Sequence, residues 1–119
     1  MNLPEVGELS RRVRLWSVSH APSGDSDLGE SRDLIAETWA KLEIVGGSQY
    51  WDSVNVDETL THRFWLRYLP GRTRPLDLAK LAEVECEGIF YRVKRCTDAN
   101  AAHRFTLLEC EELRHGLDI

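Results

Sequence analysis

The sequence lacks the features that mark membrane, secreted and metal-binding proteins. It contains no long apolar run, so we predict no transmembrane helix. Its first residues, MNLPEVGELSRR, lack the basic-then-apolar pattern of a secretion signal. Only three cysteines occur, Cys86, Cys96 and Cys110, without a CxxC pair, so we expect reduced thiols and no disulfide. A zinc site that combines these cysteines with His62 or His103 has no support from their spacing.

The motifs of common enzymes are also missing. There is no Gly-rich phosphate loop, no GxSxG elbow and no HExxH. The histidines are scattered, and none stands close in sequence to a cysteine or serine with a supporting acid. We therefore predict no catalytic residue, no metal, no cofactor and no enzymatic activity, because nothing converges on a reaction class.

The composition that remains is that of one soluble domain. The 119 residues suit a single domain, with 42% hydrophobic and 29% charged residues. We expect one β-barrel domain over residues 1–112 and a tail over residues 113–119.

Short segments with alternating apolar residues predict an all-β fold. Six segments read as strands: Leu9–Ser19, Glu37–Val45, Thr61–Leu69, Leu76–Glu87, Ile89–Cys96 and His103–Cys110. The Ser-, Gly- and Asp-rich segment His20–Asp33 is expected to be a mobile loop, and Glu87–Gly88 a tight hairpin turn. Leu76–Leu81 alone also fits a helix, so the start of the fourth strand stays open. The sequence predicts six antiparallel strands that curl into a small barrel or sandwich.

The stretch THRFWLRYLPGRTRP stands out because its charged residues are all basic, although the chain as a whole is acidic. Between Thr59 and Leu76 there are four arginines and no acid, although the net charge of the chain is −5. The next strand carries three glutamates, Glu83, Glu85 and Glu87, on one face. These glutamates either form cross-strand pairs with Arg63 and Arg67, or they meet the basic surface of an identical neighbour in a ring. We predict a docking surface for a subunit or partner that consists of Arg63, Trp65, Arg67, Arg72 and Arg74.

The connection between the second and third strands is the other candidate site. Its first residues are Gly46, Gly47, Ser48, Gln49, Tyr50, Trp51 and Asp52, and a short helical turn could follow the cap Ser48. Tyr50 and Trp51 either close one end of the barrel or anchor a partner, since Tyr and Trp are enriched at interface hot spots.

A basic strand with aromatic residues also suggests nucleic acid. A small nucleic-acid-binding barrel could use Arg63, Trp65 and Arg67 as a stacking and phosphate platform. The negative net charge argues against tight binding, because such proteins normally carry a positive surplus.

The order of the motifs resembles that of the tailed-bacteriophage head–tail joining proteins, also called head completion or stopper proteins. The segments GELSRRVRL, ETWAKLEIVGGSQYW, THRFWLRYLPG, EGIFYRVKRCTDAN and HRFTLLECEE follow one another over about residues 7–112. The segment LDLAKLAEVECE departs from the shorter strand of the family at this place.

The resemblance implies a small β-barrel that forms a ring, of twelve copies in the virion. The ring would join a portal-side adaptor protein to the tail or tail-terminator protein in the virion neck, after assembly in the host bacterial cytoplasm. The loop Gly46–Glu58 would reach the channel and help to retain packaged double-stranded DNA, without sequence-specific binding. The resemblance implies no enzymatic activity, no cofactor and no membrane. A tail-completion protein of similar fold is the alternative within the virion.

Overall fold

Six strands make up most of the chain. The computed structural model describes residues 2–20, 30–45 and 60–113. The strands are β1 (Arg11–His20), β2 (Glu30–Ile44), β3 (His62–Arg67), β4 (Glu83–Cys86), β5 (Ile89–Asp98) and β6 (Phe105–Glu112), with two short 3-10 helices, η1 (Val6–Glu8) and η2 (Ala99–Ala101). The predicted all-β class is confirmed, and no helix of the described ranges is long and apolar enough to cross a membrane.

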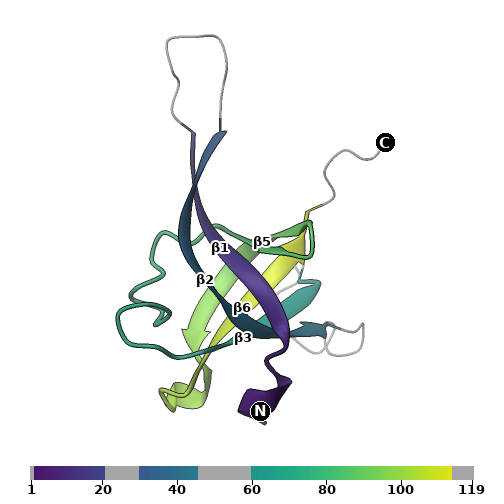
Figure 1. The fold of residues 1–119 in the computed structure, drawn as a ribbon, viewed down its shortest axis with the longest axis vertical. Coiled ribbons are helices and arrows are strands. Elements are labelled where there is room, and N and C mark those ends of the chain that lie inside the picture. Colours follow the sequence, from purple (N-terminus) through teal and green to yellow (C-terminus); the bar gives the residue numbers. More distant parts are fainter. Residues whose placement is uncertain (1, 21–29, 46–59, 114–119) are drawn as a thin grey trace.

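The strands close into a barrel in the order β1-β2-β3-β6-β5-β4, and each pairs antiparallel with its neighbours (Figure 1). β4 closes the barrel because it pairs with β1 on one side and β5 on the other. Closure pairs each strand with a neighbour on both sides, although β1 after Trp16 and β2 before Ala40 pair with each other alone.

The barrel interior holds the inward-facing residues of the alternating segments. Val13, Leu15, Phe64, Leu66 and Leu108 are fully buried there, as expected for residues two apart on a strand. The three cysteines are free thiols, and Cys86 and Cys110 belong to this core. Burial raises the pKa of Cys96 to about 11, so these thiols carry little of the reactive thiolate.

A second apolar cluster covers the outer face of β3 and β6. It joins Trp65, Phe105 and Leu107 with Leu9 and Ala99. β3 is therefore buried on both faces, which explains why three consecutive residues, Phe64 to Leu66, are inaccessible.

The structure corrects one predicted boundary and determines one that the sequence left open. β2 begins at Glu30 rather than Glu37, so part of the segment expected to be loop is strand. Its polar residues pair with β1 through the backbone, as Ser31 does with Ser19, and such pairing does not need an apolar pattern. β4 is confined to Glu83–Cys86, because residues 70–80 form turns.

The tight turn between β4 and β5 is confirmed. Glu87 and Gly88 have φ angles of 54° and 83°, and two consecutive positive φ angles are typical of a type I′ hairpin turn. Glycine adopts this conformation without strain, and its position sets the register of the two strands.

Candidate protein-docking site

The two glutamates of β4 and Glu87 in the turn after it pair with β1 and β2. Glu87 accepts from Arg11 at 2.7 Å, and Glu83 accepts from Arg32 at 2.9 Å. Glu85 accepts from the indole nitrogen of Trp16 at 3.1 Å. The interpretation that these glutamates pair with Arg63 and Arg67 is wrong, because β3 lies between β2 and β6 and does not adjoin β4.

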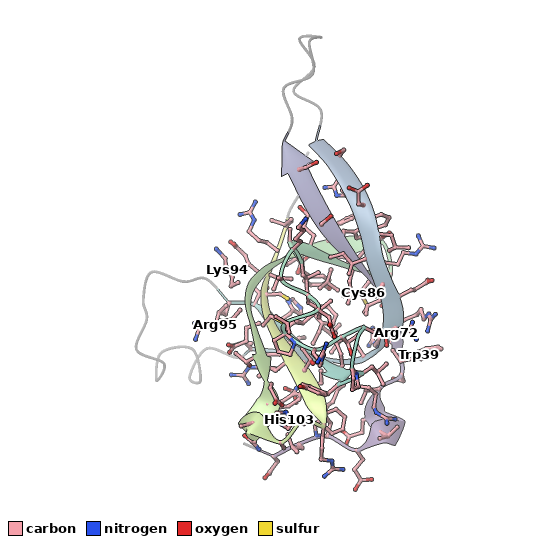
Figure 2. All side chains as sticks on the ribbon, turned by 90° about the vertical axis from the view of Figure 1, so that its left-hand side faces the viewer. Trp39, Arg72, Cys86, Lys94, Arg95 and His103 are labelled. Carbon is pink, nitrogen blue, oxygen red and sulfur yellow. The ribbon has the colours of Figure 1, made fainter. Side chains whose placement is uncertain are left out.

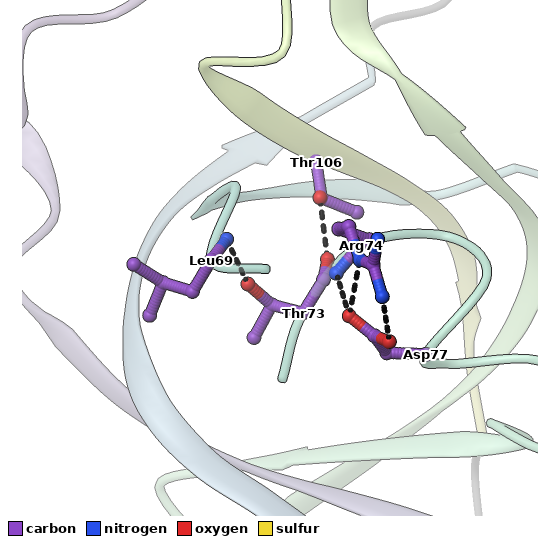
Figure 3. Close-up of polar contacts among 5 residues, drawn as sticks. All are labelled: Leu69, Thr73, Arg74, Asp77 and Thr106. Carbon is purple, nitrogen blue, oxygen red and sulfur yellow. Dashed lines mark hydrogen bonds and ion pairs between the residues drawn. The ribbon is translucent and has the colours of Figure 1, made fainter. Parts of the chain in front are cut away.

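Two of the four arginines in the basic stretch form ion pairs, and the other two are exposed. Arg63 forms an ion pair with Glu109 of β6, with Nε 3.7 Å from the carboxylate. Arg74 donates two bonds of 2.9 Å to the two oxygens of Asp77, which holds the pKa of that carboxyl below its usual value (Figure 3). Arg67 and Arg72 are exposed, and neither has a carboxylate partner within the described ranges.

A buried threonine fixes the backbone that carries these two arginines. The hydroxyl of Thr73 accepts from the backbone N–H of Leu69 at 2.8 Å and donates to the carbonyl of Arg67. Its own carbonyl accepts from the hydroxyl of Thr106 at 2.6 Å, as Figure 3 shows. The connection after β3 is therefore fastened both to the end of its own strand and to β6.

Trp39 stands between two arginines on the outer face of the barrel. It pairs with Arg12 of β1, and the Arg12 guanidinium carbon lies 5.2 Å from the centre of its ring. On the other side, Ala40 pairs with Leu66, which places the next residues, Trp39 and Arg67, beside each other. Trp39 is 50% exposed and extends outward from β2 (Figure 2).

A hollow of about 390 Å³ adjoins this tryptophan. Its lining is Val6, Leu9, Ser10, Trp39 and Arg67, and we call these residues, together with Arg12, the Trp39 groove. A second hollow of about 500 Å³ on the other side of Trp39 is lined mainly by charged residues of β1, β2 and β4. Tryptophan and arginine dominate interface hot spots, so the groove suits a partner that offers an apolar side chain and negative charge.

The docking surface predicted from the sequence left out Trp39 and included Trp65. Trp65 is only 2% exposed, and its indole nitrogen donates to Glu43 at 2.9 Å. In the chain as described, its ring packs against the N-terminal segment and is not offered to a partner. The alternation in ETWAKLEIV places Trp39 on the outer face, and an aromatic residue at an outward position was the available signal.

The predicted channel-loop residues, Gly46, Gly47, Ser48, Gln49, Tyr50, Trp51 and Asp52, lie outside the described residues. The two ends of this connection are held together at the barrel. The Val45 N–H donates to the Thr61 carbonyl at 2.9 Å, and the Thr61 N–H donates to the Cys110 carbonyl at 2.9 Å. Whether the loop reaches a channel stays a prediction.

No group of three or more His, Cys, Asp or Glu side chains within the described ranges could hold a metal ion. The charged side chains near Trp39 form ion pairs across strands, as Arg14 does with Glu37 at 3.4 Å. The site offers an accessible aromatic surface and charged groups, which suit contact with another molecule.

These features define a class: a small closed β-barrel whose exposed aromatic and basic groove suits assembly with other proteins. The chain matches the family of phage head completion proteins over residues 4–113, and it belongs to that family. A search of curated proteins gives no match.

Family membership confirms the resemblance seen in the sequence. The chain is a structural phage protein of head completion, a component of the virion at the head–tail junction. Its role there implies contact with other virion proteins, for which the Trp39 groove is the candidate surface.

Proposed function

We propose that this protein forms a ring in the head–tail connector, where it joins the portal-side adaptor to the tail and helps to retain packaged DNA. The observation that carries the proposal is Arg67, an exposed arginine that lies beside a half-exposed tryptophan in a head completion protein. Charged groups at such a surface select partner and register more than they add affinity.

The barrel provides a rigid body for such a ring. Because its strands close on themselves, the barrel offers mainly side-chain surfaces for contact between copies. The exposed arginines Arg67 and Arg72 and the neighbouring Trp39 supply one face of that contact.

The charge of the chain suits a DNA conduit. A net charge of −5 repels phosphate, so DNA can slide past, whereas a strongly basic wall would hold it. The connection Gly46–Glu58, whose ends are held at the barrel, carries Asp52, Asp57 and Glu58, and we propose that it reaches the channel.

The alternative of a nucleic-acid-binding barrel loses its main support. The proposed platform of Arg63, Trp65 and Arg67 needs an accessible ring, but Trp65 is packed beneath Leu9. Arg63 also forms an ion pair with Glu109. Direct stacking of bases on this strand is therefore not favoured.

The proposal is tested by charge reversal at the two exposed arginines. Arg67→Glu and Arg72→Glu should each leave the circular dichroism spectrum unchanged and abolish the joining of filled heads to tails, because like charges would then face the partner. Lys80→Glu is the matched control, since Lys80 is also exposed in the same connection but is not among the predicted docking residues.

Electron microscopy of heads that carry the portal and adaptor supplies the second readout. Wild-type protein should add a ring beneath the adaptor. Full joining by the folded Arg67→Glu variant would remove Arg67 from the contact, and density only at the tail end would favour the tail-completion alternative.

A further inference from the structure

The hairpin of β1 and β2 extends beyond the barrel as a two-stranded ribbon. β1 pairs with β4 only as far as Trp16, and the residues after it pair with β2 alone. Figure 1 shows this part of the hairpin projecting away from the other strands. An isolated two-stranded ribbon is marginally stable in water, so a projecting ribbon gains stability when a partner covers it.

The ribbon exposes an apolar side chain at its base. Leu34 is 51% exposed, because a β-bulge between Leu15 and Trp16 shifts the pairing and sets Leu34 opposite Trp16. The exposed Asp33 precedes it, while the neighbouring Arg32 is paired with Glu83 of β4. The ribbon therefore offers an apolar contact together with negative charge.

The Trp39 groove offers the complementary chemistry. Its hollow is lined by Val6, Leu9 and Trp39, with the exposed guanidinium of Arg67 at one side. Arg12 flanks the same tryptophan on the other side. An apolar side chain such as leucine can enter the hollow while the exposed Arg67 meets the carboxylate of Asp33.

The groove of one chain cannot be filled by its own ribbon. Leu34 and Trp39 lie on the same strand, five residues apart, which separates them by about 17 Å at the usual rise per residue. Only a second copy can bring a ribbon to the groove. Because ribbon and groove are different surfaces, the contact is heterologous, and repeated contacts of this kind form a ring when the rotation between copies closes.

We propose that the ribbon of each subunit docks in the Trp39 groove of its neighbour, with Leu34 in the hollow beside Val6 and Trp39. The inference rests on the proposed ring and names its subunit contact. Nucleic acid is the less favoured occupant, because Arg67 is the charged residue in a lining that is otherwise apolar or uncharged.

Cross-linking in assembled particles tests the contact directly. The variant Leu34→Cys/Val6→Cys is joined to filled heads under reducing conditions, and the particles are then oxidised. Within one chain the two sulfurs are too far apart to bond, so every disulfide links two copies. We expect a ladder of dimers, trimers and larger species on a non-reducing gel, whereas each single-cysteine variant should give dimers at most.

The outcomes separate this inference from the proposed function. Joined heads without a ladder would overturn the ribbon contact and leave the connector role standing. A ladder that stops at dimers would indicate a closed pair and overturn the ring contact. Failure of the wild-type protein to join heads would instead reject the function. Loss of the ladder when a single-stranded oligonucleotide is added before oxidation would assign the groove to nucleic acid.

Substitution of the exposed leucine gives an independent test. Leu34→Lys should fold normally and reduce joining at least tenfold, while Leu34→Met should keep it. Leu76→Lys is the matched control, because Leu76 is 76% exposed and lies outside both ribbon and groove. Equal joining by Leu34→Lys and Leu76→Lys would contradict the contact.

Discussion

Trp39 and Trp65 face outward from adjacent strands and differ almost completely in exposure. Trp65 is 2% exposed beneath Leu9, whereas half of Trp39 is accessible. We predict that Trp65→Ala lowers the free energy of unfolding by about 3–5 kcal/mol, since it leaves a cavity in the second cluster. Trp39→Ala should cost about 1 kcal/mol or less, because its ring is already half in water. Urea denaturation of the two variants measures the difference.

Head–tail joining by the same two tryptophan variants gives a second measurement. If Trp39 anchors a partner, Trp39→Ala should stay folded and lose head–tail joining. An equally large loss of stability in both variants would contradict the assignment of Trp39 to a docking surface.

His62 links stability to pH. Burial against Tyr91, whose ring centre lies 4.9 Å away, lowers the pKa of His62 below its usual value, and the carboxylate of Glu112 offsets this only in part. The unfolded chain therefore takes up the proton first as the pH falls below about 6.5, so the free energy of unfolding should decrease.

The measurement compares urea denaturation at pH 7.5 and pH 5.5. The wild-type protein should be less stable at pH 5.5, and His62→Gln should show a smaller difference between the two values. The lowered pKa values of Glu8 and Asp77 act only at more acid pH, because these carboxylates are still ionised at 5.5. An unchanged pH dependence in His62→Gln would rule out His62 as the source.

Alternation in the sequence divides the residues of β1 and β3 between two faces. It could not predict which outward residues are covered, because that depends on segments distant in sequence. Trp65 is buried by Leu9 and Ala99, which lie far from it along the chain. Period-2 patterning specifies a face of the strand, while the accessibility of that face is a tertiary property.

At the scale of elements, the hydroxyl of Thr73 stabilises the connection between β3 and β4. Thr73→Val keeps the shape of the side chain but leaves the Leu69 N–H and the Arg67 carbonyl without their partner. We predict a loss of about 1–3 kcal/mol in the free energy of unfolding, since unsatisfied polar groups carry their full desolvation cost. Thr73→Ser retains the hydroxyl and should lose less, as thermal or urea denaturation would show.

The ribbon illustrates why element boundaries were missed. Residues 30–33 are polar and were expected to be loop, yet they pair with β1 through backbone bonds, and the Ser19 and Ser31 hydroxyls lie 2.7 Å apart. Backbone pairing is independent of side-chain polarity. The turn at Glu87–Gly88 was predictable, because a local requirement for positive φ leaves a signature in the residue types.

At the scale of the molecule, strand number and antiparallel pairing followed from the sequence, but strand order did not. The partners of Glu83 and Glu87 depend on β4 lying next to β1, and closure of the barrel decides that adjacency. Charge patterns limit the possible pairings without selecting one. The same closure leaves Arg67 exposed beside Trp39, although nothing in the local sequence joins the two residues.

The connection between β2 and β3 allows a test of whether the proposed ring retains DNA. Hairpin connections usually take about two to five residues, whereas the segment between Val45 and Thr61 is far longer. Its extra length serves either packing of Tyr50 and Trp51 against the barrel or obstruction of DNA by a ring of identical loops. Each loop alone would act weakly, but many loops on one DNA end would act together.

Replacement of Ser48–Asp57 by a short Gly-Ser linker separates the two roles. If the loop gates the channel, the variant should fold and join heads with an unchanged melting temperature, and packaged DNA should leak before tails attach. If Tyr50 and Trp51 pack against the barrel, the variant should melt at a markedly lower temperature, because about 3–5 kcal/mol is lost for each large ring removed from a core. Nuclease sensitivity of the DNA in filled heads, measured beside calorimetry of the variant, gives both readouts. A folded variant whose heads retain DNA as well as wild type would reject the gate, since the ring would then hold DNA without its loops.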